Sequence, residues 1–458
     1  MAGYGKLQVG AASTDITPPP DTQLAGAVGY HRPPKAALDP LQAKAMAFKV
    51  EGCELCLLAL DVTIITEEWT TYIRDRIYHL LGIPRDAIMI HATQTHTAPP
   101  IGHFMLDPDF PELPQQFEWV RGGDEEYSRW AADRGAEAIV QAIELREPVE
   151  MAVASGSDGR WAANRRAVTM DGGVTMVYGD WADPAAEQRI RYIEGPIDGE
   201  VGVAVLRRDD LSVPGMLLHH TCHPVCVFTK PLASADWPGA WAGEMRDLFG
   251  EKCVPLVING ACGNINPADR DDHRAMGRGL AETTEMVLPR MEFTDEATLD
   301  FRRVELPIPL REVTDEELAW ARGVLDAHPE PPWDPDRPGQ LVREWIEAAS
   351  TWSVHLQRQR DTSLAYEIQV LRVGDMAVVG LPGEPFVELG LAIKMASPFA
   401  STFIAHCTSH YTGYIPTAEA LQRGGHESVT RYWAKLVPEA FEMIRDEATR
   451  VLAEVHGE

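Results

Sequence analysis

Apolar and polar residues follow strand-like and helix-like patterns in turn along most of the chain. Residues 56–65 form an apolar, β-branched run of strand length, and residues 67–81 then carry apolar side chains at helical spacing up to Gly82. This alternation predicts an α/β fold, a class whose functional sites lie at strand ends and in the following loops. The same succession recurs at residues 86–96, 213–225, 238–250, 253–260 and 376–394.

Two segments are expected to lie outside the sheets. Residues 105–127 are rich in Pro, Asp and Glu and are expected to form a surface excursion. A proline-rich loop at residues 328–339 separates two helical patterns, the first with Thr314 and Glu317 placed for a capping box. We expect these helices to form an antiparallel hairpin on the outside of the molecule, over about residues 313–360.

The C-terminal part of the chain and the absence of linkers indicate a single domain. Residues 428–457 predict a long C-terminal helix with a kink at Pro438. No internal repeat or linker divides the chain. We therefore expect residues 1–458 to form a single large domain of mixed sheets with surrounding helices.

Composition narrows the classes of partner. The chain has 69 acidic and 41 basic residues, a formal charge of −28, which argues against nucleic acid or an anionic membrane surface as the main partner. It contains neither a signal-peptide pattern nor an apolar run of membrane-spanning length, so we expect a cytoplasmic protein with a small-molecule substrate. The Cys53-x-x-Cys56 pair leads into a strand and has no second cysteine pair at suitable spacing, so metal is not expected there.

Chemistry-bearing side chains gather at strand-end corners. In an extended backbone Gln94 and His96 point to one side and His91 to the other. Taken singly, such residues have ordinary explanations, because a histidine at a strand end is most often structural and an Asn-Gly corner is usually only a turn. The corners are residues 91–99, 219–224, 259–267, 381–386 and 410–427.

The order of these motifs resembles the catalytic N-terminal domain of neutral/alkaline ceramidases and their uncharacterised bacterial relatives. The family's C-terminal immunoglobulin-like domain is not expected in this chain. The matching motifs span nearly the whole sequence: Gly10-Ala-Ala-Ser-Thr-Asp15, Asp39-Pro-Leu, Leu58-Ala-Leu-Asp61, Thr93-x-Thr-His96-Thr-Ala-Pro, Asn164-Arg-Arg166, Cys222-His-Pro, Ser234-Ala-Asp-Trp-Pro-Gly239, Asn259 to Pro267, Pro382-Gly-Glu384 and Tyr414-Ile-Pro-Thr.

The resemblance implies a zinc-dependent site. In the family a single zinc lies between two His, a Glu and a Tyr and activates water against an amide carbonyl. The matching positions imply zinc ligands at His223, Glu384 and Tyr414. They also imply an acid/base or carbonyl-orienting role for His96 and a substrate contact for Arg165.

Three positions depart from the family pattern. The first zinc-ligand position is Gln94, whose amide oxygen is a weaker and harder donor than imidazole. Three outcomes stay open: zinc held with Gln94 or a shifted His96, a harder ion such as Mn²⁺ or Mg²⁺, or no metal. His91 contributes only if the strand register differs. Asn266 stands at the family's hydroxyl position, and His426 at that of a second Tyr.

The sequence therefore favours a metal-dependent hydrolase of an amide or related C–N bond in a small soluble metabolite, with ceramide itself not expected. Metal-activated water attacks the carbonyl, while His96 transfers protons. Tyr414 and Asn266 stabilise the oxyanion, and Arg165 holds an anionic part of the substrate.

Two alternatives remain. The first is a metal-free lyase or isomerase that uses His91, His96, His223 and His426 for acid/base chemistry. The second is a degenerate, non-catalytic protein whose pocket senses or carries a ligand.

Overall fold

Three mixed sheets form the centre of the molecule in the computed structural model, which describes residues 2–177, 189–228, 230–269 and 272–457. The first sheet has the strand order β6-β5-β4-β2-β7: Ile88–Ala92, Cys53–Leu60, Gln42–Val50, Gln8–Asp15 and Glu147–Pro148. The second has the order β16-β14-β13-β8: Val254–Asn259, Gly215–His220, Glu200–Arg207 and Glu150–Ser157. The third has the order β1-β18-β19-β20-β22: Gly3–Lys6, Glu296–Pro309, Ser363–Val373, Met376–Gly380 and Ser401–Ala405.

Each of these sheets contains one parallel strand pair joined by a helix. The pairs are β5 with β6, β14 with β16, and β20 with β22. The connecting helices are α1 (Glu67–Leu81), α4 (Asp236–Phe249) and α8 (Val387–Ala396). Parallel neighbours need such a crossover, and both strands then end at the same edge of their sheet. Three βαβ units thus supply the loops that carry the site.

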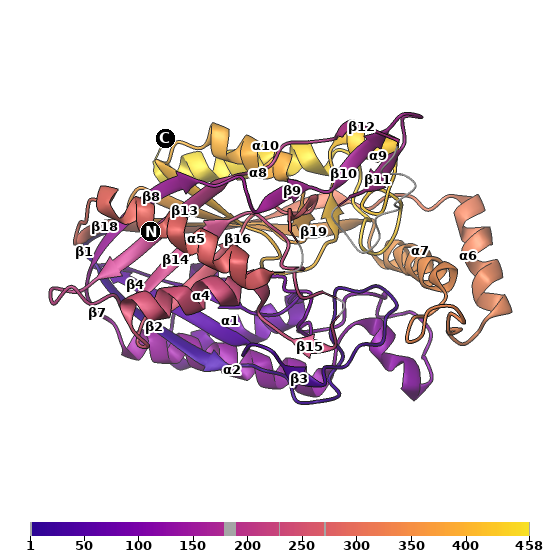
Figure 1. Ribbon diagram of the computed structural model, residues 1–458, viewed down its shortest axis with the longest axis horizontal. Helices are drawn as coiled ribbons and strands as arrows, with labels where there is room; N and C mark the ends of the chain where they lie inside the picture. The colour runs from indigo at the N-terminus through magenta and orange to yellow at the C-terminus, as the bar shows by residue number, and fades with distance from the viewer. Residues whose placement is uncertain (1, 178–188, 229, 270–271, 458) are drawn as a thin grey trace.

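Helices cover the outer faces of the sheets (Figure 1). The first sheet is covered by α2 (Glu125–Glu144), with α1 alongside, and the second by α4 and α5 (His273–Val287). The third is covered by α8 and α10 (Ala440–His456). The helix-covered mixed sheets confirm the predicted α/β class.

Smaller elements complete the chain. Within the described residues no helix is both long and apolar enough to cross a membrane. The remaining elements are β3 (Ala36–Ala37), β9 (Ala162–Asn164), β10 (Arg166–Thr169), β11 (Val174–Met176), β12 (Ile190–Ile193), β15 (Leu232–Ala233), β17 (Ile265–Pro267), β21 (Glu384–Pro385), β23 (Tyr414–Ile415), α6 (Asp315–Ala327), α7 (Arg343–Arg360), α9 (Ala418–Arg423), and the 3₁₀ turns η1 (Arg85–Ala87), η2 (Gln115–Arg121) and η3 (Leu288–Arg290).

Helix α1 has the bounds that its periodicity predicts. It begins with Glu67 and Glu68, acidic residues that favour the positive end of the helix dipole. It ends at Gly82, which adopts φ +74°, a left-handed conformation that glycine reaches without a steric penalty. One face of the helix, including Ile73 and Ile77, is buried in the core.

Helices α6 and α7 pack on each other at one end of the molecule (Figure 1). The predicted capping box at Thr314 and Glu317 is present at the start of α6. Helix α7 is far from peripheral, because its inner face is buried, with Trp345 only 1% exposed.

The prediction for the C-terminal segment is wrong in its bounds. The helix begins at Ala440, after Pro438, and the residues before it form turns and isolated bridges. Proline lacks the N–H that a helix interior needs and its ring clashes with the preceding turn, so Pro438 precedes the helix instead of kinking it. The non-helical segment before Pro438 places Trp433 in the wall of a cleft.

Candidate active site

A cleft of about 800 Å³, including the open space at its mouth, lies where loops from the first and third βαβ units meet. The loop after β6 supplies Gln94 and His96, and the loops after β20 and β22 supply Glu384 and Tyr414. These polar groups form the floor together with Tyr411 and His426, and the walls are apolar: Ile64, Phe104, Met105, Leu106, Trp119, Val120, Ile346 and Trp433.

The expectation for residues 105–127 is wrong in part. This segment is not only a surface excursion, because Met105, Trp119 and Val120 line the cleft. The side chains of Phe110 and Phe117 anchor the segment in the core. The acidic and proline-rich composition of the segment indicates a solvent-exposed loop, although its phenylalanines are buried.

His223 and Glu384 meet at one point of the site. His223 Nε2 lies 3.1 Å from Glu384 Oε2, and both side chains are at least 95% buried. Burial opposes ionisation of Glu384, but the contact with His223 outweighs it and holds the pKa of the carboxyl well below its usual range. The other ring nitrogen of His223 and the other carboxylate oxygen of Glu384 also have hydrogen-bond partners. His223 Nδ1 lies 2.9 Å from the Ile265 carbonyl oxygen, and the Tyr411 hydroxyl donates to Glu384 Oε1 at 2.8 Å.

His96 offers a free imidazole beside this pair. Its ring centroid lies 5.4 Å from that of His223 and 5.5 Å from that of Phe228. Burial, followed by the proximity of His223, lowers the pKa of His96 to about 3, so the ring is neutral near pH 7. Its ring nitrogens make no hydrogen bond to any described residue, and the ring lines the cleft. Gly26, at φ +89°, permits this placement, because a Cβ there would lie 2.4 Å from the His96 ring.

Gln94 lies in the cleft in an unusual backbone conformation. Its φ is +68°, in the left-handed region, because β6 ends at Ala92 and the chain turns immediately afterwards. The predicted extended backbone is therefore absent here, although Gln94 and His96 still share the cleft. Among the described residues, the Gln94 side-chain oxygen accepts a single long contact of 3.6 Å, from the Cys262 thiol.

Arg165 forms a buried hub behind the cleft. Its guanidinium donates to Glu427 Oε1 at 2.9 Å, to Asn266 Oδ1 at 3.2 Å and to the Tyr414 hydroxyl at 3.2 Å. Neither Arg165 nor Asn266 lines the cleft. Arg165 is thus placed to orient Tyr414, and three of its five N–H groups are already directed at protein acceptors. Glu427 also accepts from Arg166 at 2.7 Å.

His426 occupies the far side of the floor. Its ring stacks on Trp433 with centroids 5.5 Å apart and meets the edge of Tyr414 at 5.5 Å. Burial lowers the pKa of His426 to about 4. The structure describes no hydrogen bond to its ring nitrogens.

His91 is structural. Its Nε2 accepts from the Asn259 backbone N–H at 3.0 Å, and its Nδ1 lies 2.6 Å from the His406 carbonyl oxygen. These bonds join β6 to β16 and to the end of β22. Both nitrogens are occupied, so His91 does not reach the cleft.

Several residues of the site carry no clear signal in the sequence. Tyr411 and Glu427 are close in sequence to the predicted site residues Tyr414 and His426. Their own contacts, with Glu384 and Arg165, are seen only in the folded structure. Glu427 pairs with an arginine 262 positions away. Trp119 and Gly26 also line the cleft, but they lie in segments whose composition is typical of loops and indicates no functional role.

The donor set resembles only part of a zinc site. Within the described residues no group of three or more His, Cys, Asp or Glu side chains is arranged to hold a metal ion. Of the four positions implied by the resemblance, His223 and Glu384 are strong donors and Gln94 and Tyr414 are neutral ones. Burial and the charge of Glu384 raise the pKa of Tyr414 well above its usual value, so its phenol keeps its proton in this arrangement.

Comparison with known proteins supports the fold. No protein-family model and no curated protein sequence matches the chain. Among solved structures, neutral ceramidase from Pseudomonas aeruginosa aligns with a TM-score of 0.71 at 16% identity, over 98% of this chain and 75% of that one. A ceramidase complexed with C2 aligns with a TM-score of 0.69 at 14% identity over the same shares. The resemblance inferred from the motif order is thereby confirmed at the level of fold, and the chain has the fold of the neutral ceramidases.

Proposed function

We propose that this protein is a hydrolase of an amide or related C–N bond in a small soluble metabolite. The observation that carries the proposal is that Glu384, Tyr414 and His96 line one cleft, with His223 in contact with Glu384 behind them. The His96 ring nitrogens have no hydrogen-bond partner among the described residues. A ceramidase-like fold is compatible with this chemistry, since the neutral ceramidases align over almost the whole chain.

The two strong donors of the site, His223 and Glu384, are of the kinds that divalent cations bind. The outer partners of His223 and Glu384 turn Nε2 and Oε2 toward each other, as in sites where a backbone carbonyl or hydroxyl orients each ligand. A divalent cation could replace this direct contact, because an imidazole nitrogen and a carboxylate oxygen are both metal donors. We therefore propose His223, Glu384, Tyr414 and Gln94 as its holders. With three oxygen donors the set suits a harder ion than zinc or a weakly held zinc.

The protein side chains have distinct proposed roles in the reaction. The cation, when bound, would polarise the carbonyl and acidify the attacking water. His96 takes the proton from that water as its oxygen attacks the carbonyl carbon, and returns it to the leaving nitrogen as the C–N bond breaks. Because the Tyr414 oxygen accepts from Arg165, its own proton remains available for the developing oxyanion.

The test combines metal analysis with hydrolysis of a panel of small N-acyl amines and N-acyl amino acids. We expect the holoprotein to carry a near-stoichiometric divalent ion, to lose activity on chelation and to regain it with Mn²⁺ or Zn²⁺. Glu384→Gln should reduce metal content and activity together. Unchanged activity in chelated protein shown to contain no metal would refute the cation's role. A silent panel with tight ligand binding would indicate the non-catalytic alternative.

Gln94→His provides a separate measurement of the cation site. Histidine tolerates the left-handed backbone at this position better than most residues, and it restores an imidazole donor. We expect zinc to bind at least about tenfold more tightly, measured by competition with a chelating dye. Gln94→Asn is the matched control, because it also tolerates φ +68° but adds no imidazole.

The metal-free alternative is favoured by one observation. His96 and His426 both present imidazoles without described hydrogen-bond partners to the same cleft. Such a pair is suited to proton transfer in a lyase or isomerase. This alternative predicts that Gln94→His gains zinc without gaining the native activity.

A further inference from the structure

The cleft continues into an outer chamber of about 720 Å³, a volume that includes the open space at its mouth. Residues shared by the two spaces show that they adjoin: Gly26, Val28, Ile346, His426 and Trp433. The outer chamber differs in character, because charged side chains from the proline-rich loop and from α7 line it: Asp334, Arg337, Arg343 and Glu347.

The lining of this chamber carries two arginines and two carboxylates. Glu347 is paired with Arg343 at 2.7 Å and with Arg431 at 3.0 Å, so two guanidiniums share one carboxylate. Arg431 does not line the chamber but adds a third guanidinium beside it. The chamber therefore lacks the acidic excess of the whole chain, whose formal charge is −28.

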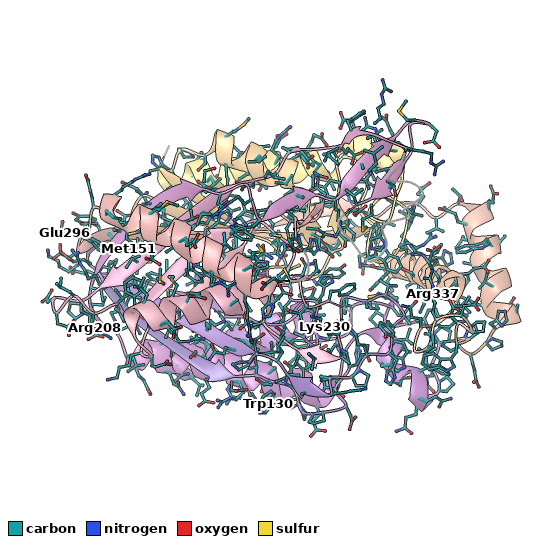
Figure 2. All side chains as sticks on the ribbon, viewed as in Figure 1. Trp130, Met151, Arg208, Lys230, Glu296 and Arg337 are labelled. Atoms are coloured by element: carbon teal, nitrogen blue, oxygen red, sulfur yellow. The ribbon has the colours of Figure 1, made fainter. Side chains whose placement is uncertain are left out.

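Arg337 is the cation left available. It lies at the same end of the molecule as α7 (Figure 2) and is exposed, and its side chain makes no hydrogen bond or ion pair with the described residues. The loop that carries it is held in place, because Gln340 N–H donates to the Arg337 carbonyl at 3.0 Å and His31 N–H to the Gly339 carbonyl at 2.8 Å. The guanidinium is therefore presented at the chamber by a fixed backbone.

We propose that the outer chamber binds an anionic group of the substrate, a carboxylate or phosphate distal to the scissile bond, with Arg337 as the specificity-determining residue. The inference deepens the proposed function and rests on it: the amide lies on the inner floor, the apolar middle of the substrate lies along Trp433 and Ile346, and the anion lies at Arg337. A guanidinium suits this role because its planar fork can donate two parallel hydrogen bonds to either anion.

The test uses matched compounds with and without the charge. N-benzoyl derivatives of ω-amino acids with chains of two to six carbons are compared with their ω-carboxamides, and N-benzoyl-O-phosphoethanolamine represents the phosphate. Hydrolysis supplies KM and kcat, and calorimetry supplies Kd for the same compounds. The variants are Arg337→Gln and, as a matched control, Arg290→Gln, an exposed arginine outside both chambers.

The native protein should prefer one anionic chain length over its carboxamide. Arg337→Gln should raise KM or Kd for that anion about tenfold, leave kcat within about twofold, and leave the carboxamide unaffected. Arg290→Gln should change neither. Whichever of the carboxylate and phosphate compounds has the lower KM or Kd identifies the anionic group that the chamber binds.

The outcomes separate this inference from the proposed function. Selective weakening of anion binding by Arg337→Gln without turnover would support the chamber and refute the hydrolase. Turnover without charge preference, or an equal effect on anion and carboxamide, would refute the chamber alone. If no compound is bound or hydrolysed, both are overturned.

Discussion

At the scale of single residues, the buried ion pairs behind the cleft determine how the reactive groups are held. Glu427 is 1% exposed and lies between Arg165 and Arg166. Burial opposes its ionisation, but the two guanidiniums outweigh burial and lower its pKa to about 2. Glu427 therefore keeps Arg165 in a fixed orientation, and Arg165 in turn holds the Tyr414 hydroxyl.

Replacing Glu427 should show how much this hub stabilises the protein. Glu427→Gln leaves two buried guanidiniums sharing a neutral amide, so we expect the free energy of unfolding to fall by about 3 kcal/mol in chemical denaturation. Glu454→Gln is the control, because Glu454 pairs with Arg450 in an exposed setting and its loss should cost less than about 1 kcal/mol. Equal effects of the two substitutions would contradict the assignment of a buried hub.

At the scale of elements, two loop segments distant in sequence form the mouth of the cleft together. Trp119 of η2 stacks on Trp333 of the proline-rich loop, with ring centroids 6.1 Å apart and planes at 23°. His31 lies against Trp119 at 5.0 Å. The excursion at 105–127 and the loop before α7 thus stabilise each other over the cleft. Their composition suggested only solvent-facing loops.

Removing one ring of this stack should affect substrate binding more than turnover. Trp333 does not line the inner cleft but positions Trp119, which does. We expect Trp333→Ala to raise KM about fivefold with kcat within about twofold, the size of one lost aromatic pair. Trp130→Ala is the control, since Trp130 is similarly exposed on α2 and packs near Tyr127. A selective fall in kcat would show that the stack acts on the chemistry instead.

At the scale of the whole molecule, the packing of three sheets buries many ionisable groups. Burial lowers the pKa of His91 and His426 to about 4. Glu367, despite its burial, is held at a pKa of about 2 by Arg74. All these groups bind protons more readily in the unfolded chain than in the folded one. Protonation of this kind therefore favours unfolding.

Stability should accordingly fall with acidification. The histidines contribute from about pH 6.5, their usual pKa, down to about pH 4, where the folded forms also protonate. The depressed carboxylates add to the loss below about pH 4.5. We expect the thermal midpoint, followed by circular dichroism, to drop progressively from pH 7 to pH 4. High salt should leave the histidine part largely intact, because it originates from burial. A midpoint constant over this interval would contradict the described burial.

Local pattern in the sequence was sufficient for much of the architecture. Helical periodicity placed α1 correctly up to Gly82, the capping box at Thr314 started α6, and the strand-end corners contained Gln94, His96, Glu384 and Tyr414. These features depend on neighbouring residues, so they can be recognised from the amino-acid order. The last helix begins at Ala440, later than predicted. The apolar residues before Pro438 have helical spacing, but they belong to a segment of turns that places Trp433 in the cleft wall.

Only the tertiary structure decided which corners meet and what each polar atom contacts. Parallel strand pairs in two different sheets must pack before Gln94, Glu384 and Tyr414 line one cleft, and a third sheet brings His223 against Glu384. The same packing directs Arg165, an expected substrate contact, toward Glu427, and it leaves Arg337 at an outer chamber without a partner among the described residues. Such partners lie hundreds of positions apart, so their contact depends on how the sheets associate and leaves no local pattern in the sequence.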